Sequence, residues 1–401
     1  MLGLVADRTY GPFLVGRTVS TTAIWMHNIL AAVLAYQITG STVPVALVSV
    51  AQFAPQIVLA PLSGAMADRG NRRRQVVVGR WVSAAGSGGL AAYIALVGAD
   101  NMSHVWPVVL SSGTVGIGFV IGGPAMNALI PAMVGPEEVA SAVILSSVPS
   151  TLARAAGPAI GTAIALTAGP QVSFGIAAIG HVIFALVMIW IPISGAVRVR
   201  ATDSSVRAGF RHLRVDASLI LLLLGVAAVG AGADPSITLT PALSEQLHRH
   251  TDLVGLFASC FGIGAGLGFL LLPVVQRWAS TSVIATLGLF QLGAGCLLLA
   301  LPVTPALLAF LFAVVGIGMT FALTTLSAQI QSRVPEHLRG RIMALWSVAF
   351  LGSRPIIALI NGTIADHVGV RVALLVTGAV VLATCWLCRP ARIRPYQFTE
   401  G

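Results

Sequence analysis

The chain has 401 residues, of which 56% are apolar and only 9% are charged, and its formal net charge is +10. Soluble domains carry roughly 25% charged residues, so the composition excludes an ordinary soluble protein and indicates a membrane protein. The positive charge does not indicate nucleic-acid binding, because the arginines gather in short segments between long apolar stretches. No lysine is present, which excludes a nucleotide-binding loop of the Gly-x-x-x-x-Gly-Lys type.

The apolar stretches predict membrane-spanning helices along the whole chain. Such a helix needs about 20 apolar residues, and no cleavable signal peptide is clear before the first one. The predicted spans are 12–38, 43–66, 75–98, 105–131, 139–168, 171–193, 217–241, 253–276, 281–301, 304–331, 341–365 and 370–389. The sequence therefore predicts an all-α membrane protein with twelve transmembrane helices.

The arginines between the spans predict the orientation. With twelve spans, most of them fall on one face of the membrane, and the opposite face holds only Arg249 and Arg371. The first group is Arg69, Arg72, Arg73, Arg74, Arg198, Arg200, Arg207, Arg211, Arg214, Arg333, Arg339, Arg341, Arg389, Arg392 and Arg394. Because basic loops stay inside, we expect a multi-pass protein of the inner (plasma) membrane with both termini in the cytoplasm.

The longest polar interval, 194–216, divides the chain near its middle. We predict a cytoplasmic linker there, between an N-terminal six-helix bundle (1–193) and a C-terminal one (217–401). The two bundles are expected to be pseudo-symmetric, because three features recur about half a chain apart. They are Pro136-Glu137 with Pro335-Glu336, Arg154 with Arg354, and Gly161-Thr162 with Gly362-Thr363. Repeats of this kind place the solute site near the bilayer midplane, between the halves.

The loop after the second span reads Gly-Ala-Met-Ala-Asp-Arg-Gly-Asn-Arg-Arg-Arg over residues 64–74. It resembles the signature loop of the major facilitator superfamily of secondary transporters. In that family the loop locks the cytoplasmic side of the outward-facing transporter, so the resemblance implies a gating role for the matching residues Gly64, Asp68, Arg69, Arg72 and Arg73. Asn71 replaces the family's second glycine, and asparagine tolerates positive φ, so we expect the turn to survive. The alternative is a basic membrane anchor with no further role.

The fifth span contains Gly157-Pro158-Ala-Ile-Gly161. This resembles the core of the antiporter motif of the family's exporters and implies a smooth helix face on which helices slide. The family's upstream glycines are absent, and the fourth span lacks the arginine that drug antiporters often carry. An ordinary kinked helix is the alternative.

The stretches 123–138 and 334–344 resemble one branch of the superfamily, which contains the enterobactin exporters and the macrolide efflux proteins. The resemblance implies a secondary active exporter of small organic molecules that works by alternating access. Because no nucleotide-binding loop is present, we expect proton antiport as the energy source, and we expect a monomer. A nutrient importer on the same fold is the alternative, and a non-transporting sensor or assembly factor is an alternative of another class. The spans hold no metal-ligand cluster and no Ser/His dyad, so we expect neither an enzyme nor a cofactor or metal.

Ionisable groups inside the spans are candidates for function, because they are costly to bury in a bilayer. Asp234 is the only carboxylate well inside a span and is a candidate proton carrier. Alternatively it caps a helix that is broken at Pro235. His27 is the next candidate for proton coupling, although a lone intramembrane histidine is more often a hydrogen-bonded packing residue.

Arg154 and Arg354 lie at matching places in the two halves, and we predict that they bind an anionic or oxygen-rich solute together with Asn28. Alternatively the two arginines are structural and pair with helix-end carbonyls or with Asp234. Arg17 lies early in the first span, where we expect it to reach the cytoplasmic interface by snorkelling.

Overall fold

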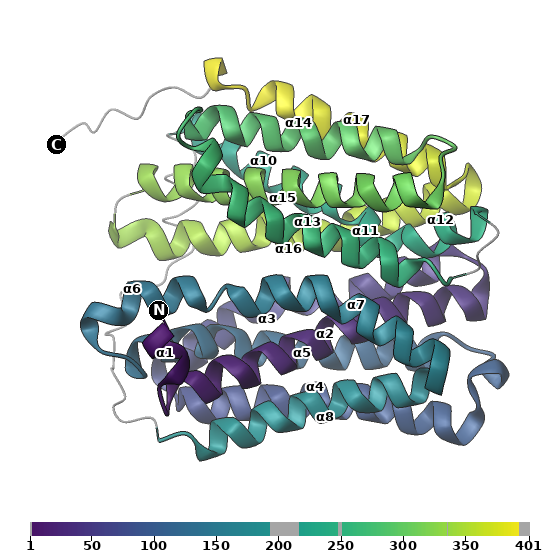
Figure 1. The fold of residues 1–401 in the computed structure, drawn as a ribbon, viewed down its shortest axis with the longest axis horizontal. Helices are drawn as coiled ribbons and strands as arrows, with labels where there is room; N and C mark the ends of the chain where they lie inside the picture. Colours follow the sequence, from purple (N-terminus) through teal and green to yellow (C-terminus); the bar gives the residue numbers. More distant parts are fainter. Residues whose placement is uncertain (1, 193–215, 248–250, 335, 393–401) are drawn as a thin grey trace.

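The computed structural model describes residues 2–192, 216–247, 251–334 and 336–392, without the side chains of residues 2, 61, 68, 69, 140, 336–341 and 344. Throughout these ranges the regular structure is helical (Figure 1). The predicted linker 194–216 lies outside the described residues except for Asp216. The expectation of an all-α fold is confirmed.

The helices before the gap pack together and are called the N half, residues 2–192. They are α1 (Leu2–Ala6), α2 (Tyr10–Thr39), α3 (Thr42–Arg69), α4 (Arg72–Val97), η1 (Ala99–Asn101), α5 (Trp106–Leu129), η2 (Ile130–Ala132), η3 (Pro136–Glu138), α6 (Val139–Leu145), α7 (Val148–Ala168) and α8 (Pro170–Trp190).

The helices after the gap form the C half, residues 216–392, which lies above the N half in Figure 1. They are α10 (Ala217–Ala233), α11 (Pro235–Thr238), α12 (Thr240–Gln246), α13 (Val254–Val275), α14 (Thr281–Leu299), α15 (Pro305–Arg333), α16 (Glu336–His367), α17 (Val370–Leu387) and η4 (Pro390–Arg392).

Among the described residues, 10 helices are long and apolar enough to cross a membrane. The long helices α4 and α7 are not among them, and both carry arginine, at Arg72, Arg73, Arg74 and Arg80 in α4 and at Arg154 in α7. These two helices coincide with the third and fifth predicted spans. The helices are thus consistent with twelve crossings.

Two predicted spans are not continuous helices. The span 139–168 is divided between α6 and α7 at Ser146 and Ser147, whose hydroxyls donate to Val143 O and Ile144 O at 2.7 Å. These bonds occupy carbonyls in the last turn of α6, and Pro149 has no N–H to continue the ladder. The span 217–241 breaks at Asp234, because Pro235 begins the short helix α11.

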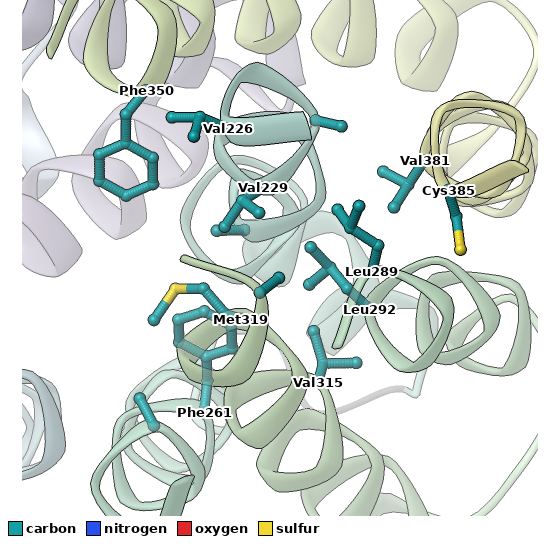
Figure 2. Close-up of a cluster of buried hydrophobic side chains, with 14 of the residues drawn as sticks. Val226, Val229, Phe261, Leu289, Leu292, Val315, Met319, Phe350, Val381 and Cys385 are labelled. Atoms are coloured by element: carbon teal, nitrogen blue, oxygen red, sulfur yellow. The ribbon is translucent and has the colours of Figure 1, made fainter. Parts of the chain in front are cut away.

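Each half has its own apolar core. In the C half, side chains from α10, α13, α14, α15, α16 and α17 meet around Val229, Leu289 and Met319 (Figure 2). Glycines bring α13 and α15 into backbone contact, because a Cβ on Gly264 would lie 2.7 Å from Ala313 Cα. Close backbone approach through small residues is how helices associate in a membrane.

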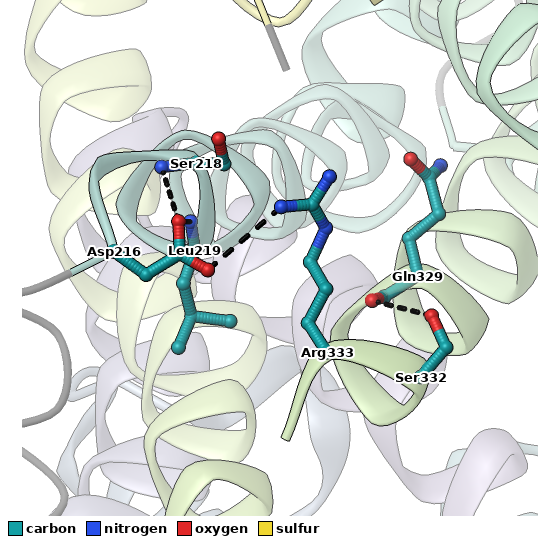
Figure 3. A network of polar contacts seen from close by, with 6 residues as sticks. All are labelled: Asp216, Ser218, Leu219, Gln329, Ser332 and Arg333. Atoms are coloured by element: carbon teal, nitrogen blue, oxygen red, sulfur yellow. Dashed lines mark hydrogen bonds and ion pairs between the residues drawn. The ribbon is translucent and has the colours of Figure 1, made fainter. Parts of the chain in front are cut away.

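We name the two ends of the molecule after the ends of α2, as the Tyr10 end and the Thr39 end. The Thr39 end has tight turns, in which Gly169 (φ 92°) joins α7 to α8 and Gly369 (φ 115°) joins α16 to α17. Only glycine adopts such a φ readily. At the Tyr10 end, Asp216 accepts from Ser218 N (2.9 Å) and Leu219 N (3.3 Å) and lies 3.8 Å from Arg333 Nη1, which ties the start of α10 to the end of α15 (Figure 3).

The halves share apolar contacts at the Thr39 end. One buried cluster there combines Ile29 and Val33 of α2 with Ile237, Val254 and Ala258 of the C half. The buried cluster at the Tyr10 end of the N half, around Phe13 and Phe184, contains N-half residues only among those described. The described conformation is therefore one in which the halves are packed together at the Thr39 end.

Candidate functional site

Two helix pairs cross between the halves, α7 with α13 and α3 with α16. In the first pair, Gly262 of α13 lies against the backbone carbonyl of Arg154, and a Cβ on Gly255 would lie 2.6 Å from Thr162 Cβ. In the second pair, a Cβ on Gly362 of α16 would lie 3.0 Å from Thr42 O. The helices that hold Arg154 and Arg354 thus both lie at the boundary between the halves.

Arg154 is a partly buried side chain of α7 that reaches residues of both halves. Its guanidinium lies 4.9 Å from the centroid of the Trp25 ring on α2, and Nη1 lies 3.3 Å from Met319 Sδ on α15. Its Nε is buried without a described hydrogen-bond partner. No described carbonyl or carboxylate bonds to it, so the predicted structural pairing with helix-end carbonyls is not present in this conformation.

Arg354 is 4% exposed and also contacts both halves. Its guanidinium lies 5.1 Å from the Phe53 ring of α3 and 5.5 Å from the Phe350 ring of α16, both within cation–π range. Its Nε has no described partner, as in Arg154, and the charges of the two arginines act on each other. Two like charges, each with a buried Nε that has no described partner, thus lie at the same boundary.

Asp234 is 3% exposed and lies at the junction of α10 and α11. Its Oδ1 accepts from Thr238 Oγ1 and its Oδ2 accepts from Asn361 Nδ2, both at 2.9 Å. Asn361 Oδ1 in turn accepts from Thr377 Oγ1 at 2.7 Å. The side chain makes no capping bond to the backbone of α11, so the capping alternative is wrong for this conformation. The charge of Arg354 acts on this carboxylate, although the two form no ion pair within 4.0 Å in the described part.

His27 and Asn28 are buried side by side in α2. The His27 ring nitrogens lie 3.0 Å from Ser87 Oγ and 3.3 Å from Ser112 Oγ, and the ring packs edge-on against Phe174 at 5.2 Å. This is the environment of a hydrogen-bonded packing histidine. Asn28 Oδ1 has no described partner. The structure does not bring either residue into described contact with Asp234, Arg154 or Arg354.

The loop 64–74 is short, because α3 ends at Arg69 and α4 begins at Arg72. The side chains of Asp68 and Arg69 lie outside the described residues. Arg72 donates to Ala67 O (2.9 Å), and Arg73 donates to the α8 carbonyls of Met188 (2.5 Å) and Ile189. These arginines satisfy helix-end carbonyls, which have no partner within their own helix.

Two details of this loop differ from expectation. Asn71 does not adopt positive φ, since it has φ −83° and ψ 100° and caps α4 by accepting from Arg74 N at 3.0 Å. An N-cap needs extended backbone and a side-chain acceptor, and asparagine supplies both. A Cβ on Gly64 would meet no described atom within 4 Å, so no helix approaches closely there in this conformation.

The predicted sliding face of α7 lies against α2. A Cβ on Gly157 would come within 2.8 Å of Trp25 Cβ, and one on Gly161 within 3.2 Å of Met26 Cβ. Pro158 lies inside α7, which remains one helix over Val148–Ala168. The glycines thus permit a close crossing of α7 over α2, next to the boundary between the halves.

Two charged residues, Arg80 and Asp366, were not anticipated from the sequence, and the expectation for a third, Arg17, was different. Arg80 lies inside the predicted span 75–98 and is 2% exposed, and its place in an apolar stretch was the available signal. Arg17 is buried as well, at 8% exposed, so the expectation that it snorkels to the interface is wrong. Both side chains are buried within the N half.

The second is Asp366 at the end of α16, which bonds to the start of α3 in the other half. It accepts from Ser41 Oγ, from Thr42 N (2.6 Å) and from Val43 N (3.0 Å). We call these four residues the Asp366 clamp. Its signal in the sequence was weak, because an acid at a helix end is common and its partner lies more than 300 residues away.

A profile of the transmembrane secretion effector family matches residues 6–400. The macrolide efflux protein A of Streptococcus pyogenes is 23% identical over 359 residues, which cover 87% of each chain. The enterobactin exporter EntS of Escherichia coli O1:K1 / APEC is 26% identical over 360 residues, covering 85% of this chain and 83% of the exporter.

Solved transporters share the fold. A bacterial homologue of the iron transporter ferroportin in an inward-facing state superposes with a TM-score of 0.75 at 16% identity, covering 94% of this chain and 97% of that one. A D-xylose-proton symporter gives 0.73 at 14% identity, with 96% and 98% covered. The family profile matches nearly the whole sequence, and the fold is that of the solved transporters. The chain therefore belongs to the transmembrane secretion effector family, a group of major facilitator transporters.

Proposed function

We propose that this transporter exports small organic molecules by alternating access, driven by proton antiport. The observation that carries the proposal is the group at the boundary of the halves, where Arg154, Arg354 and the buried carboxylate Asp234 lie close enough for their charges to interact. The efflux relatives support export. The chain would act as a monomer, with the polar segment 194–216 linking its two bundles.

The arginines of the loops support placing the Tyr10 end at the cytoplasm, in the inner membrane. The packed Thr39 end then faces outward, and the described conformation is the inward-facing one. The Asp366 clamp would hold this state. In the outward-facing state the loop 64–74 would instead hold the cytoplasmic side closed. Asp68 would be the hydrogen-bond acceptor, with Gly64, Arg69, Arg72 and Arg73 beside it. The face formed by Gly157, Pro158 and Gly161 would allow α7 to slide during the change between states.

Arg154 and Arg354 are proposed to bind the solute. Each has a guanidinium stacked on an aromatic ring and a buried Nε without a described partner. Guanidinium groups match carboxylate and other oxygen-rich groups through paired N–H donors. A solute with such groups, with Asn28 as a further contact, would offset the repulsion between the two cations.

Asp234 is proposed to carry the proton, with His27 next in line. Protonation removes the negative charge that acts on Arg354, so the proton and the solute act on the same cation. Loading one therefore changes the affinity for the other, which is the coupling that antiport requires.

The test uses proteoliposomes of the full chain with an imposed pH gradient and two probes, a macrolide and enterobactin. We expect the solute to move against its own gradient, in the direction opposite to proton flow. We expect Asp234→Asn to abolish this movement. Solute movement that ignores the pH gradient would refute antiport. Solute movement in the same direction as the protons, together with uptake into intact cells, would support an importer instead.

A further inference from the structure

The N half contains a second group of buried cations, away from the boundary between the halves. Arg17 of α2 and Arg80 of α4 are 8% and 2% exposed. Arg80 Nη1 donates to Ser20 Oγ at 3.1 Å and Nη2 donates to Gly118 O at 3.3 Å. Ser20 Oγ also lies 2.9 Å from Nδ1 of His181 on α8. Helices α2, α4, α5 and α8 thus converge on one polar spot inside the N half.

This spot has more hydrogen-bond donors than acceptors. Arg17 Nε and Nη1, Arg80 Nε and His181 Nε2 are all buried without a described partner. The charges of Arg17 and Arg80 act on each other, and no described carboxylate acts on either. The N-half acids all lie outside the predicted spans, at Asp7, Asp68, Asp100, Glu137 and Glu138.

The two arginines lie at one depth. Arg17 comes seven residues after the start of α2 and Arg80 eight residues after the start of α4. At a rise of about 1.5 Å per residue, both lie roughly 10–12 Å from the Tyr10 end of the bundle. Arg80 also bonds to Ser20, three residues after Arg17 on α2, so one ligand can contact both guanidinium groups.

We propose that Arg17 and Arg80 form a site inside the N half that holds one oxyanion, namely a phosphate group. Two desolvated cations without a counter-charge are strongly unfavourable in a membrane protein, and an anion supplies both the charge and the missing acceptors. Guanidinium forks bind phosphate oxygens in pairs. Ser20 completes the site by orienting Arg80 and His181. The site is independent of solute binding at Arg154 and Arg354.

In the test, the delipidated full-length protein in detergent is titrated with inorganic phosphate, and the melting temperature of the protein is measured at each phosphate concentration. A ligand that binds the folded state alone raises the melting temperature in a saturable way. Arg80→Gln and Arg17→Gln should each weaken phosphate binding at least about tenfold, because each removes charge-assisted bonds. The exposed Arg277→Gln is the control for loss of one positive charge and should leave binding unchanged.

A second experiment distinguishes two sources of the phosphate group, a lipid headgroup and free inorganic phosphate. Wild-type protein from vesicles of phosphatidylcholine and phosphatidylglycerol is examined by native mass spectrometry, and a lipid headgroup source predicts retained phosphatidylglycerol that Arg80→Gln loses. Binding of free phosphate alone supports a soluble source. If neither phosphate nor lipid binds, the site is filled by water and the proposal is wrong. It is equally wrong if Arg154→Gln abolishes phosphate binding while Arg17→Gln preserves it. Should Arg80→Gln not fold, Arg17→Gln and the wild-type titration decide.

Discussion

Removing the carboxylate of Asp366 should shift the transporter away from the described conformation. The Asp366 clamp spans the two halves at the Thr39 end, and Asp366→Ala deletes the acceptor for Ser41 Oγ, Thr42 N and Val43 N at once. These bonds cannot persist when the halves separate at that end. The substitution therefore destabilises this conformation relative to the opposite one.

The size of the shift follows from the kind of contact. Loss of a side-chain N-cap costs about 0.5–2 kcal/mol, and the exposure of Asp366 to solvent favours a value of about 1 kcal/mol. A change of about 1 kcal/mol alters the ratio of the two conformations roughly fivefold. Asp366→Asn retains one acceptor oxygen and should have a smaller effect in the same direction.

The measurement is a pulsed electron paramagnetic resonance distance between spin labels at Asn101 and Leu301, in a protein whose four free cysteines are replaced. Both label positions are exposed at the Thr39 end, one in each half. Asp366→Ala should enlarge the long-distance population. The control is Asp252→Ala, an exposed acid at the same end with no described hydrogen bond. An unchanged distribution in Asp366→Ala, or an equal change in the control, would refute the reasoning.

The remaining predictions concern coupling, gating, solute binding and packing. Asp234→Asn should abolish pH-driven efflux in proteoliposomes while weakening solute binding much less, and full pH dependence in the variant would exclude Asp234 as the proton carrier. Asp68→Asn should leave the protein in the membrane at equal yield but strongly lower transport, whereas normal transport would reduce the loop to an anchor. Arg154→Leu and Arg354→Leu should each weaken binding of an anionic solute at unchanged melting temperature, and a lower melting temperature with intact affinity would make either arginine structural. Gly264→Leu should lower thermal stability by about 1–3 kcal/mol or prevent folding, because its side chain would overlap the backbone of α15, and a stable variant would contradict that packing.

The helices and their order were predictable from the sequence, because a helix that crosses a bilayer needs a long apolar segment and a charge within it is energetically costly. Breaks inside a span were harder to foresee. The predicted span 139–168 is mostly apolar despite Arg154, and the local chemistry of Ser146, Ser147 and Pro149 divides it. Hydropathy responds to the average of a window and does not register these local bonds.

The individual charged residues of the site were predictable from the sequence, but the hydrogen bonds between them and their neighbours were not. Asp234, Arg154 and Arg354 stood out as charges at depth, yet the bonds from Asn361 and Thr238 to Asp234 depend on how α16 packs against the break after α10. Such contacts join positions far apart in the chain. Asn71 shows the same limit on a smaller scale, because asparagine suits both a left-handed turn and an N-cap, and only the length of the loop decides between them.

The tight turns at Gly169 and Gly369 have a mechanical consequence. Helices α7 and α16 each touch the opposite half, and each is joined to its neighbour, α8 or α17, by at most two residues. A tilt of either boundary helix is therefore passed to a second helix on the outer flank of its half, as in a lever arm. A fluorescent reporter on the lipid-facing side of α8 or α17 would register the motion without disturbing the residues that bind the solute.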